Sequence, residues 1–208
     1  MYSGLTVRTV EPLDRDLTAK ARIRDSAMEL FANQGVAGTS LRTVARAAGV
    51  SPGLVVHHFG SKEGLCRAVD EAVVERIERA LAEVPVVEGS GGELLEERGE
   101  VVTALLRSQP TLCDYLGRAL SENTEASAAL FHRLFESASR DRALVEAGAM
   151  RAKADPFWRA VNQILLIVGP LMMRPLIERE LGGSLLEEPH FGRWMRAKTD
   201  LLRKGLYK

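Results

Sequence analysis

The amino-acid sequence predicts an all-α fold, and three observations support this prediction. Strong helix formers (Ala, Leu, Arg and Glu) are abundant, whereas aromatic residues make up only 5% of the 208 residues. Apolar residues recur at intervals of three and four along much of the chain, as on the buried face of a helix. No segment shows the alternation typical of a strand, and no unit of about 20 to 50 residues is repeated.

Composition and charge exclude several classes of protein. With 46% hydrophobic residues and a net charge of zero, the chain resembles neither a disordered protein nor a uniformly basic nucleic-acid coat. Residues 1–17 lack the apolar core of a signal peptide, and the longest apolar stretch, Ile164–Met173, is too short to span a membrane. We therefore expect a cytoplasmic protein without membrane contact, in which Cys66 and Cys113 are reduced packing thiols.

The first helix is expected to start at Thr18, after a flexible arm formed by residues 1–17. The arm shows no periodicity, whereas apolar residues follow at helical spacing from Thr18 onward. Gly35 is expected to end the helix, because glycine tolerates the positive φ that a helix C-cap often requires. The apolar residues are Ile23, Ala27, Leu30 and Phe31.

Two short helices are expected next, on either side of a glycine turn. Thr39 and Ser40 can cap the second helix, in which Leu41, Val44, Ala45 and Ala48 face inward. Gly49 makes the turn. Ser51 then caps a third helix of barely two turns, and Pro52 fits its first position because the missing N–H is not needed there.

A fourth helix, capped by Ser61, is expected to run through Leu81 and to be followed by a domain boundary. The boundary falls in Pro85–Gly92, which is rich in glycine and proline. It divides an N-terminal domain (18–84) from a C-terminal domain (93–208). The helices expected beyond it are Glu93–Ser108, Pro110–Ser121, Glu125 to about Ala149, Pro156–Leu181 with kinks at Pro170 and Pro175, and Pro189–Leu202.

The two short helices and their turn form a helix-turn-helix, which is an arrangement suited to DNA. The second of the pair is narrow enough to enter the major groove with its N-terminus toward phosphates or base edges. Pro52 and Gly53 lack bulky side chains, so the backbone can approach DNA closely there, and His57 can donate to a phosphate or a base edge. Residues 18–62 carry six basic and two acidic side chains, a net charge of +4, which leaves −4 for the rest of the chain and indicates a basic head.

A specific pattern extends without a gap over roughly residues 20–75. It comprises Leu30-Phe31, Gly35, Thr39-Ser40-Leu41-Arg42-Thr43-Val44-Ala45, Ala48-Gly49-Val50-Ser51-Pro52-Gly53 and His57-His58-Phe59-Gly60-Ser61-Lys62-Glu63. This pattern resembles the DNA-binding domain of the tetracycline-repressor (TetR) family. The resemblance implies an all-α homodimer with an N-terminal three-helix helix-turn-helix domain, which reads a palindromic operator, and a C-terminal helical domain for ligand binding and dimerisation.

The resemblance also implies a set of DNA-contacting residues. Arg42 is the candidate for a base contact, because a guanidinium can form two hydrogen bonds with guanine, and Lys62 is expected to hold a phosphate. The family usually has tyrosine where this chain has Val56, which implies one phosphate contact fewer or an apolar contact with a thymine methyl. The whole set is Thr39, Ser40, Arg42, Thr43, Ser51, Pro52, Gly53, Leu54, Val56, His57 and Lys62.

A homodimer is expected, because two recognition helices must lie about 34–36 Å apart to read successive major grooves. Its interface is expected on helices 156–181 and 189–202, in a two-fold symmetric arrangement. The first of these helices is apolar on nearly every face, and the second is expected to carry Arg193 and Lys198 on its outer side. A pocket for a small apolar effector is expected among the middle helices, although the same residues fit a plain core equally well. Its candidates are Leu105, Leu112, Tyr115, Leu116, Phe131, Leu134, Phe135, Trp158 and Asn162.

Other functions fit the sequence less well than a DNA-binding repressor. No nucleophile motif or phosphate-binding glycine motif is present, so neither an enzyme nor a cofactor is expected. His132 and His190 lack companion ligands, so no metal site is expected. The main alternative is a ligand-independent DNA-binding regulator or activator with a filled C-terminal core. A helical corner without a DNA partner is a further alternative, and His58 and Phe59 fit the core better than a DNA surface.

Overall fold

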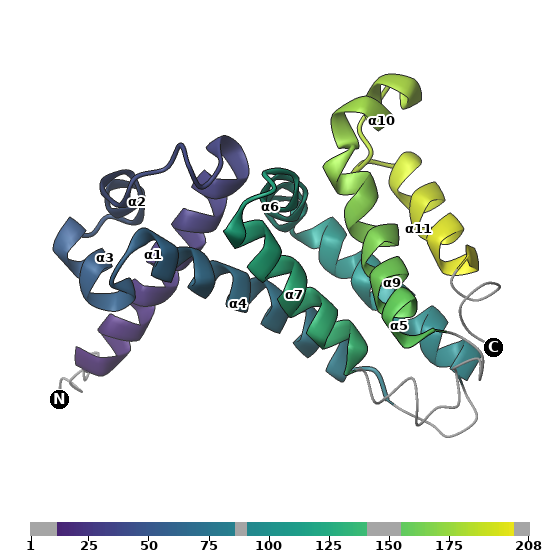
Figure 1. The fold of residues 1–208 in the computed structure, drawn as a ribbon, viewed down its shortest axis with the longest axis horizontal. Helices are drawn as coiled ribbons and strands as arrows, with labels where there is room; N and C mark the ends of the chain where they lie inside the picture. Colours follow the sequence, from purple (N-terminus) through teal and green to yellow (C-terminus); the bar gives the residue numbers. More distant parts are fainter. Residues whose placement is uncertain (1–11, 86–90, 141–154, 202–208) are drawn as a thin grey trace, which may run out of the picture.

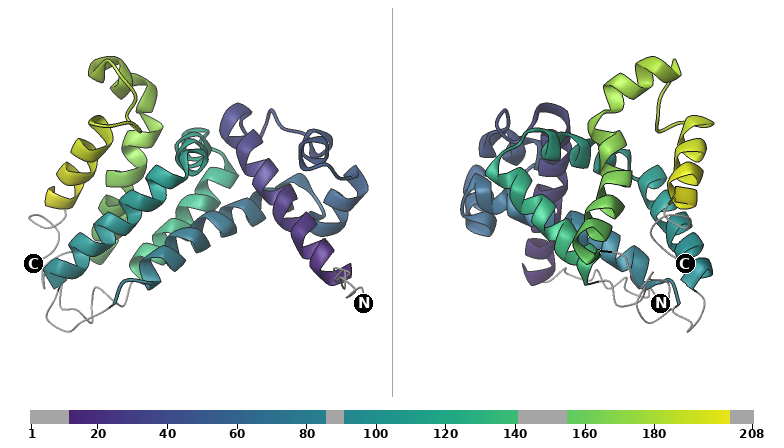
Figure 2. Two further views of the ribbon diagram at one scale, coloured as in Figure 1. Left: turned by 180° about the vertical axis from the view of Figure 1, so that it is seen from behind. Right: turned by 45° about the vertical axis from the view of Figure 1, so that its right-hand side comes forward.

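The computed structural model describes residues 12–85, 91–140 and 155–201, and these residues contain helices and no strand. The helices are α1 (Pro12–Gln34), α2 (Leu41–Ala48), α3 (Pro52–Phe59), α4 (Lys62–Ala82), α5 (Gly91–Ser108), α6 (Pro110–Ser121), α7 (Glu125–Ser139), α9 (Pro156–Met172), α10 (Arg174–Leu181) and α11 (His190–Leu201). Helices α1, α2 and α3 form one end of the molecule, and α4 runs from them toward the helices at the other end (Figure 1; Figure 2). The predicted all-α fold is confirmed.

The three N-terminal helices enclose fully buried apolar side chains. Ile23 and Phe31 of α1 meet Val44 of α2 and Val55 of α3 in one hydrophobic cluster. Helix α1 starts at Pro12 rather than at Thr18, so the predicted arm of residues 1–17 was too long, and residues 1–11 of it lie outside the described residues. Proline suits a first helical turn because its φ is already helical, and the lack of apolar periodicity over residues 12–17 concealed this start.

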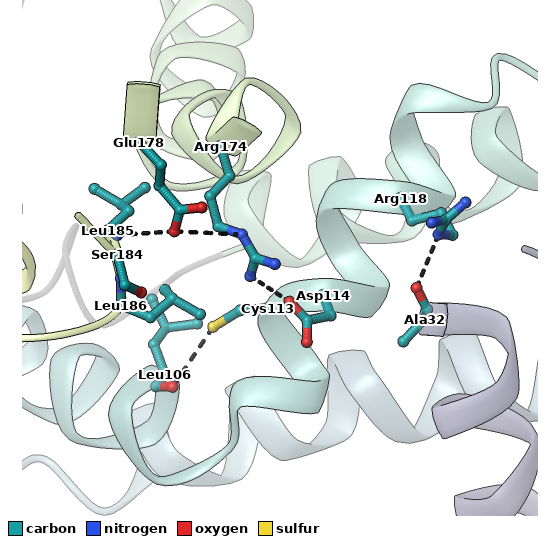
Figure 3. A network of polar contacts seen from close by, with 10 residues as sticks. All are labelled: Ala32, Leu106, Cys113, Asp114, Arg118, Arg174, Glu178, Ser184, Leu185 and Leu186. Carbon is teal, nitrogen blue, oxygen red and sulfur yellow. Dashed lines mark hydrogen bonds and ion pairs between the residues drawn. The ribbon is translucent and has the colours of Figure 1, made fainter. Parts of the chain in front are cut away.

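One hydrophobic cluster continues from the N-terminal helices into the C-terminal ones. Helix α6 packs against both α1 and α9. The ring centroids of Phe31 in α1 and Tyr115 in α6 lie 6.5 Å apart, and the Arg118 Nε of α6 donates a hydrogen bond of 2.8 Å to the Ala32 carbonyl of α1 (Figure 3). The core thus crosses the boundary expected near residues 85–92, and the division into domains 18–84 and 93–208 stays a prediction.

The middle helices pack around α6 with little space between backbones. A Cβ added at Gly117 of α6 would lie 2.7 Å from the Leu171 carbonyl oxygen of α9, so only glycine allows this approach.

Cys113 of the same helix and Cys66 of α4 are buried free thiols, as expected. Helix α7 ends at Ser139, earlier than predicted, and the Arg140 N–H bonds to the Glu136 carbonyl in its last turn; the rest of the range to Ala149 lies outside the described residues.

The helix predicted over 156–181 is two helices, which is a correction. Helices α9 and α10 meet at an angle of 69°. Pro175 sits in the first turn of α10, where it supplies no N–H to the preceding turn and disfavours a helical conformation at the residue before it. The bend is held by Arg174, which pairs with Asp114 of α6 and lies 3.7 Å from Glu178 (Figure 3). Pro170, by contrast, lies within α9.

None of the described helices is by itself long and apolar enough to cross a membrane. Helices α9 and α10 pass that test of length and composition only when they are taken together, across their bend.

Candidate nucleic-acid interface and ligand cavity

The turn between α2 and α3 is fixed by local hydrogen bonds that the sequence encodes. The Ser40 hydroxyl accepts from the Thr43 N–H at 3.1 Å and caps α2. Gly49 adopts φ +64° and ψ +40°, a left-handed conformation that glycine adopts without strain. The Val50 N–H then bonds to the Ala45 carbonyl at 2.9 Å, and the chain turns into α3.

The start of α3 is also fixed locally. The Ser51 hydroxyl accepts from the Leu54 N–H at 3.2 Å, and Pro52 occupies the first helical turn. Val55 is fully buried, so the opposite side of this short helix faces outward. That outer side consists of Pro52, Gly53, Val56 and His57, all of them exposed.

The outer side of α3 is narrow at its N-terminus and apolar in its middle. Val56 is 48% exposed, although it is apolar. Gly53 faces open space, because a Cβ added there would meet only the Ser51 hydroxyl, 4.0 Å away. Helix α3 can therefore bring its backbone close to another molecule at Gly53 and offer an apolar side chain one turn later. This shape and size fit the major groove of DNA.

The residues flanking α3 differ in accessibility. Arg42 of α2 is exposed, as a base contact requires. Thr39 is only 2% exposed, and its hydroxyl donates to the Gly35 carbonyl at 2.8 Å, so its side chain holds the loop before α2 instead of facing outward. The Lys62 ammonium donates to the Ala37 carbonyl at 3.1 Å; a lysine has two further N–H donors that remain for a phosphate.

A cavity of about 690 Å³ lies among the helices of the C-terminal half. Its walls come from α4, α5, α6, α7, α9 and α11, and apolar side chains dominate them. Leu105, Leu116 and Leu134, three of the predicted ligand-binding residues, line it together. Sites for small organic ligands typically have volumes of roughly 300–1,000 Å³, so the cavity has a suitable size.

The other predicted ligand-binding residues do not line this cavity. Leu112 is fully buried in the core, and Phe131 and Phe135 are half-buried against it. Trp158 is 58% exposed on the outside of α9, and the neighbouring Asn162 is half-buried. The C-terminal candidates therefore divide into cavity wall, core and outer surface.

Tyr115, the remaining candidate, joins α6 to α4 through a buried polar contact. Its hydroxyl donates a hydrogen bond of 2.6 Å to the Asp70 carboxylate. Burial raises the pKa of Asp70 to about 6, although the Tyr115 hydrogen bond acts in the opposite direction. The pair links α4, the helix that follows α3, to α6, and both helices contribute to the cavity wall.

Comparison with known proteins agrees with this geometry. The family model for bacterial regulatory proteins of the tetR family matches residues 23–69, which cover the helix-turn-helix. The HTH-type transcriptional regulatory protein RaaS of Mycobacterium tuberculosis is 38% identical over 156 residues, which are 74% of this chain and 69% of RaaS. The chain belongs to the TetR family. It is a DNA-binding transcriptional regulator.

Two further comparisons extend the similarity of this TetR regulator. The HTH-type transcriptional repressor Rv3405c of Mycobacterium tuberculosis is 37% identical over 109 residues, 50% of this chain and 55% of that protein. SmeT, the repressor of the Stenotrophomonas maltophilia multidrug efflux pump SmeDEF, has the same fold, with a TM-score of 0.63, 22% identity and coverage of 91% of this chain and 90% of SmeT.

Sequence reasoning missed several polar residues that line the cavity of the TetR regulator. Gln163 of α9 and Lys198 of α11 are the clearest cases. Lys198 was expected on the outer side of its helix, which is wrong: it is 4% exposed and lies at the cavity wall. It follows Phe191 and Met195 by seven and three residues on the buried face of α11, and this helical spacing was the available signal.

Proposed function

We propose that this TetR regulator is a homodimeric repressor that binds a palindromic operator and releases it when a small, largely apolar ligand fills the cavity. One observation carries the proposal: a single hydrophobic core connects two separate features. An exposed helix of a size that fits DNA lies at one end of this core, and a cavity of a size that fits a small ligand lies at the other end. Rv3405c, the relative with 37% identity, is itself named a transcriptional repressor.

The dimer interface is proposed on the outer face of α9, with α10 and α11 beside it. Trp158, Leu165 and Met172 follow one another at seven-residue spacing, so they share one face of the helix. They are 58%, 46% and 37% exposed in the single chain. Large apolar side chains aligned in this way favour burial against a second protein surface. A second copy of α9 around a two-fold axis fits, because a palindromic operator requires the same symmetry.

Control by a ligand is proposed to act through α4. This helix begins directly after α3, contributes cavity wall residues such as Val74 and Ile77, and holds Asp70 against Tyr115. A ligand that binds more tightly to one position of α4 would favour that conformation and change the spacing of the two α3 helices in the dimer. Operator affinity would fall by the factor by which the ligand prefers that conformation. The open cavity favours this function over a ligand-independent regulator with a filled core.

The test starts from the operator. Selection of bound fragments from a random DNA pool should return a palindrome with half-sites about one helical turn apart. Fluorescence anisotropy with that fragment, in a screen of apolar and amphipathic compounds, should then find at least one that releases the protein. A palindrome whose binding no cavity-binding compound alters would support the ligand-independent regulator instead.

A further inference from the structure

Lys198 is a cation buried in the wall of a cavity whose lining is mainly apolar. Its side chain comes from α11, is 4% exposed and lines the cavity. Within the described parts of the chain, Lys198 has no ion pair and no hydrogen bond from its ammonium group. An ammonium group that is largely removed from water and has no counter-ion is costly, so such lysines usually have a partner.

The cost is visible in the titration of this group. Burial lowers the pKa of Lys198 to about 8, and no neighbouring charge contributes to that shift. At neutral pH the side chain is therefore still mainly protonated. The cavity then holds a positive charge that an anion entering with a ligand would neutralise.

Among the described residues, none of the other charged groups at the cavity forms an ion pair with Lys198, and none contributes to the shift of its pKa. They are Glu71, Glu75 and Glu78 of α4, Arg98 of α5, and His132, Arg133, Glu136 and Arg140 of α7. Glu71 is paired with Arg133 at 2.9 Å, and Glu136 is paired with Arg140. The cavity also has apolar walls, to which Leu105 and Leu106 of α5 and Ile164, Ile167 and Val168 of α9 contribute.

We infer that the effector is an anionic amphiphile, whose carboxylate pairs with Lys198 while its hydrocarbon part fills the apolar cavity. This inference rests on the proposed ligand control and gives the ligand a chemical class. A charge-assisted hydrogen bond to the ammonium would satisfy the buried charge and fix the orientation of the ligand. The apolar walls would contribute most of the affinity, because apolar surface is removed from water on binding.

A cationic ligand is the competing class, since the glutamates of α4 carry negative charge near the cavity. Three probes with the same alkyl chain separate the classes: decanoate, decan-1-ol and decyltrimethylammonium, each below its micelle concentration. Direct binding is measured by isothermal titration calorimetry on the full chain. We expect decanoate to bind roughly tenfold more tightly than decan-1-ol, and the cation to bind more weakly than both.

Variants of Lys198 test the residue itself. Lys198→Met keeps most of the length of the side chain and removes the unpaired charge, so it should fold and melt at or above the wild-type temperature. It should lose the preference for decanoate over decan-1-ol, whereas Lys198→Arg should keep it. Arg67→Met, which removes an exposed cation that does not line the cavity, is the matched control and should leave binding of all three probes unchanged.

The pH dependence gives a readout that does not require a variant. Between pH 7 and 9.5 carboxylic acids and histidines normally do not change charge, but Lys198, with a pKa of about 8, loses its proton. Decanoate should therefore bind progressively more weakly to the wild-type chain, whereas binding of decan-1-ol should stay constant. A decanoate affinity that is independent of pH, or equal in wild type and Lys198→Met, would overturn the inference.

Operator release distinguishes this inference from the proposed function. If decanoate binds through Lys198 and the operator stays bound, the anionic class stands and ligand control fails for it. If decan-1-ol or the cation releases the operator and decanoate does not, ligand control stands and the anionic class is wrong.

Discussion

Two polar side chains, the buried Asp70 and the exposed Arg118, connect the two ends of this molecule. Asp70 of α4 is held by the Tyr115 hydroxyl of α6, and Arg118 of α6 reaches the Ala32 carbonyl of α1. These hydrogen bonds have definite geometry, unlike the apolar packing around them, and each links a helix of the DNA-binding end to a helix beside the cavity. A small displacement of α6 therefore bears directly on α1 and α4.

The Asp70 carboxylate makes the stability of the fold depend on pH. Its pKa is about 6 in the folded chain against an ordinary value of 3.8, so the folded state retains a proton over that interval. The contribution of Asp70 to the free energy of unfolding is fully present below pH 3.8. It decreases by about 3 kcal/mol as the pH rises to 6, since one pKa unit corresponds to about 1.4 kcal/mol.

Asp70→Asn should remove this pH dependence, because the amide stays neutral and its oxygen still accepts the Tyr115 hydrogen bond. Urea unfolding at pH 4 and pH 7 should show the variant gaining stability relative to wild type at pH 7 only. An equal difference between the two proteins at both pH values would contradict the assignment.

Arg42 and Lys62 are expected to act differently on DNA. Arg42→Ala should relax the preference for one operator base pair, because it removes a side chain proposed to read a base edge. Lys62→Ala should weaken binding to all sequences alike and flatten the slope of log affinity against log salt by about two, because one phosphate in each of the two half-sites is no longer neutralised. Anisotropy titrations on a panel of mutated operators, over several salt concentrations, measure both effects; identical profiles for the two variants would reject the division of roles.

At the scale of elements, α3 is defined by its caps and by one buried side chain. Ser51 and Pro52 start the helix, Gly60 ends it at φ +72°, and Val55 attaches it to the core. The outward side chains take little part in this framework, so the outer surface can serve recognition without cost to folding.

Gly53→Ala separates folding from recognition. The added methyl group has space within the chain, and alanine favours a helix over glycine by up to about 1 kcal/mol, so thermal stability should rise or stay level. Operator affinity should nevertheless fall, because the methyl group would stand between the α3 backbone and the DNA. Melting curves and anisotropy titrations of the same preparation test this, and an unchanged affinity would place the DNA away from Gly53.

At the scale of the whole molecule, the outer face of α9 and the exposed face of α3 belong to one functional unit. The single chain leaves Trp158 and Leu165 exposed, although both are large and apolar. A dimer formed through this face would present two α3 helices related by symmetry. Dimerisation and operator affinity are therefore expected to be lost together.

Leu165→Asp should convert the protein to a monomer and abolish tight operator binding, because two buried carboxylates would face each other across the axis. Light scattering after size-exclusion chromatography measures the mass, and anisotropy measures operator affinity. Ala128→Asp, on an exposed position of α7, is the matched control and should remain dimeric. A monomeric wild-type chain, or a dimeric Leu165→Asp variant, would require another interface.

The helix-turn-helix could be predicted from the sequence almost residue by residue, because short-range interactions determine it. Ser40, Gly49, Ser51 and Ser61 cap or turn the chain as expected. Thr39 is the exception, because its hydroxyl donates a hydrogen bond to the Gly35 carbonyl within the loop. The residue type alone did not show whether this side chain is buried in the loop or exposed to a partner. Which residues contact DNA stays a prediction.

In the C-terminal half, the helices could be predicted from the sequence, but not which face of each helix is buried, lines the cavity or is exposed. Helix α9 is apolar on nearly every face, so its sequence does not reveal which side chains meet the core and which meet a partner. Trp158 lies outside, whereas Ile164 lines the cavity. The bend at Met173 was expected only as a kink, because a proline predicts disruption but not the angle at which the chain continues.

The sequence by itself determined the helical fold, the capped helix α3 and the family, since each depends on patterns of residues that lie close together in the chain. The tertiary structure alone decided that Lys198 lies at the wall of a cavity and that Asp70 meets Tyr115. Burial and pairing of this kind depend on helices distant in the chain, and their free energies are set by the packing that removes water from around a charge.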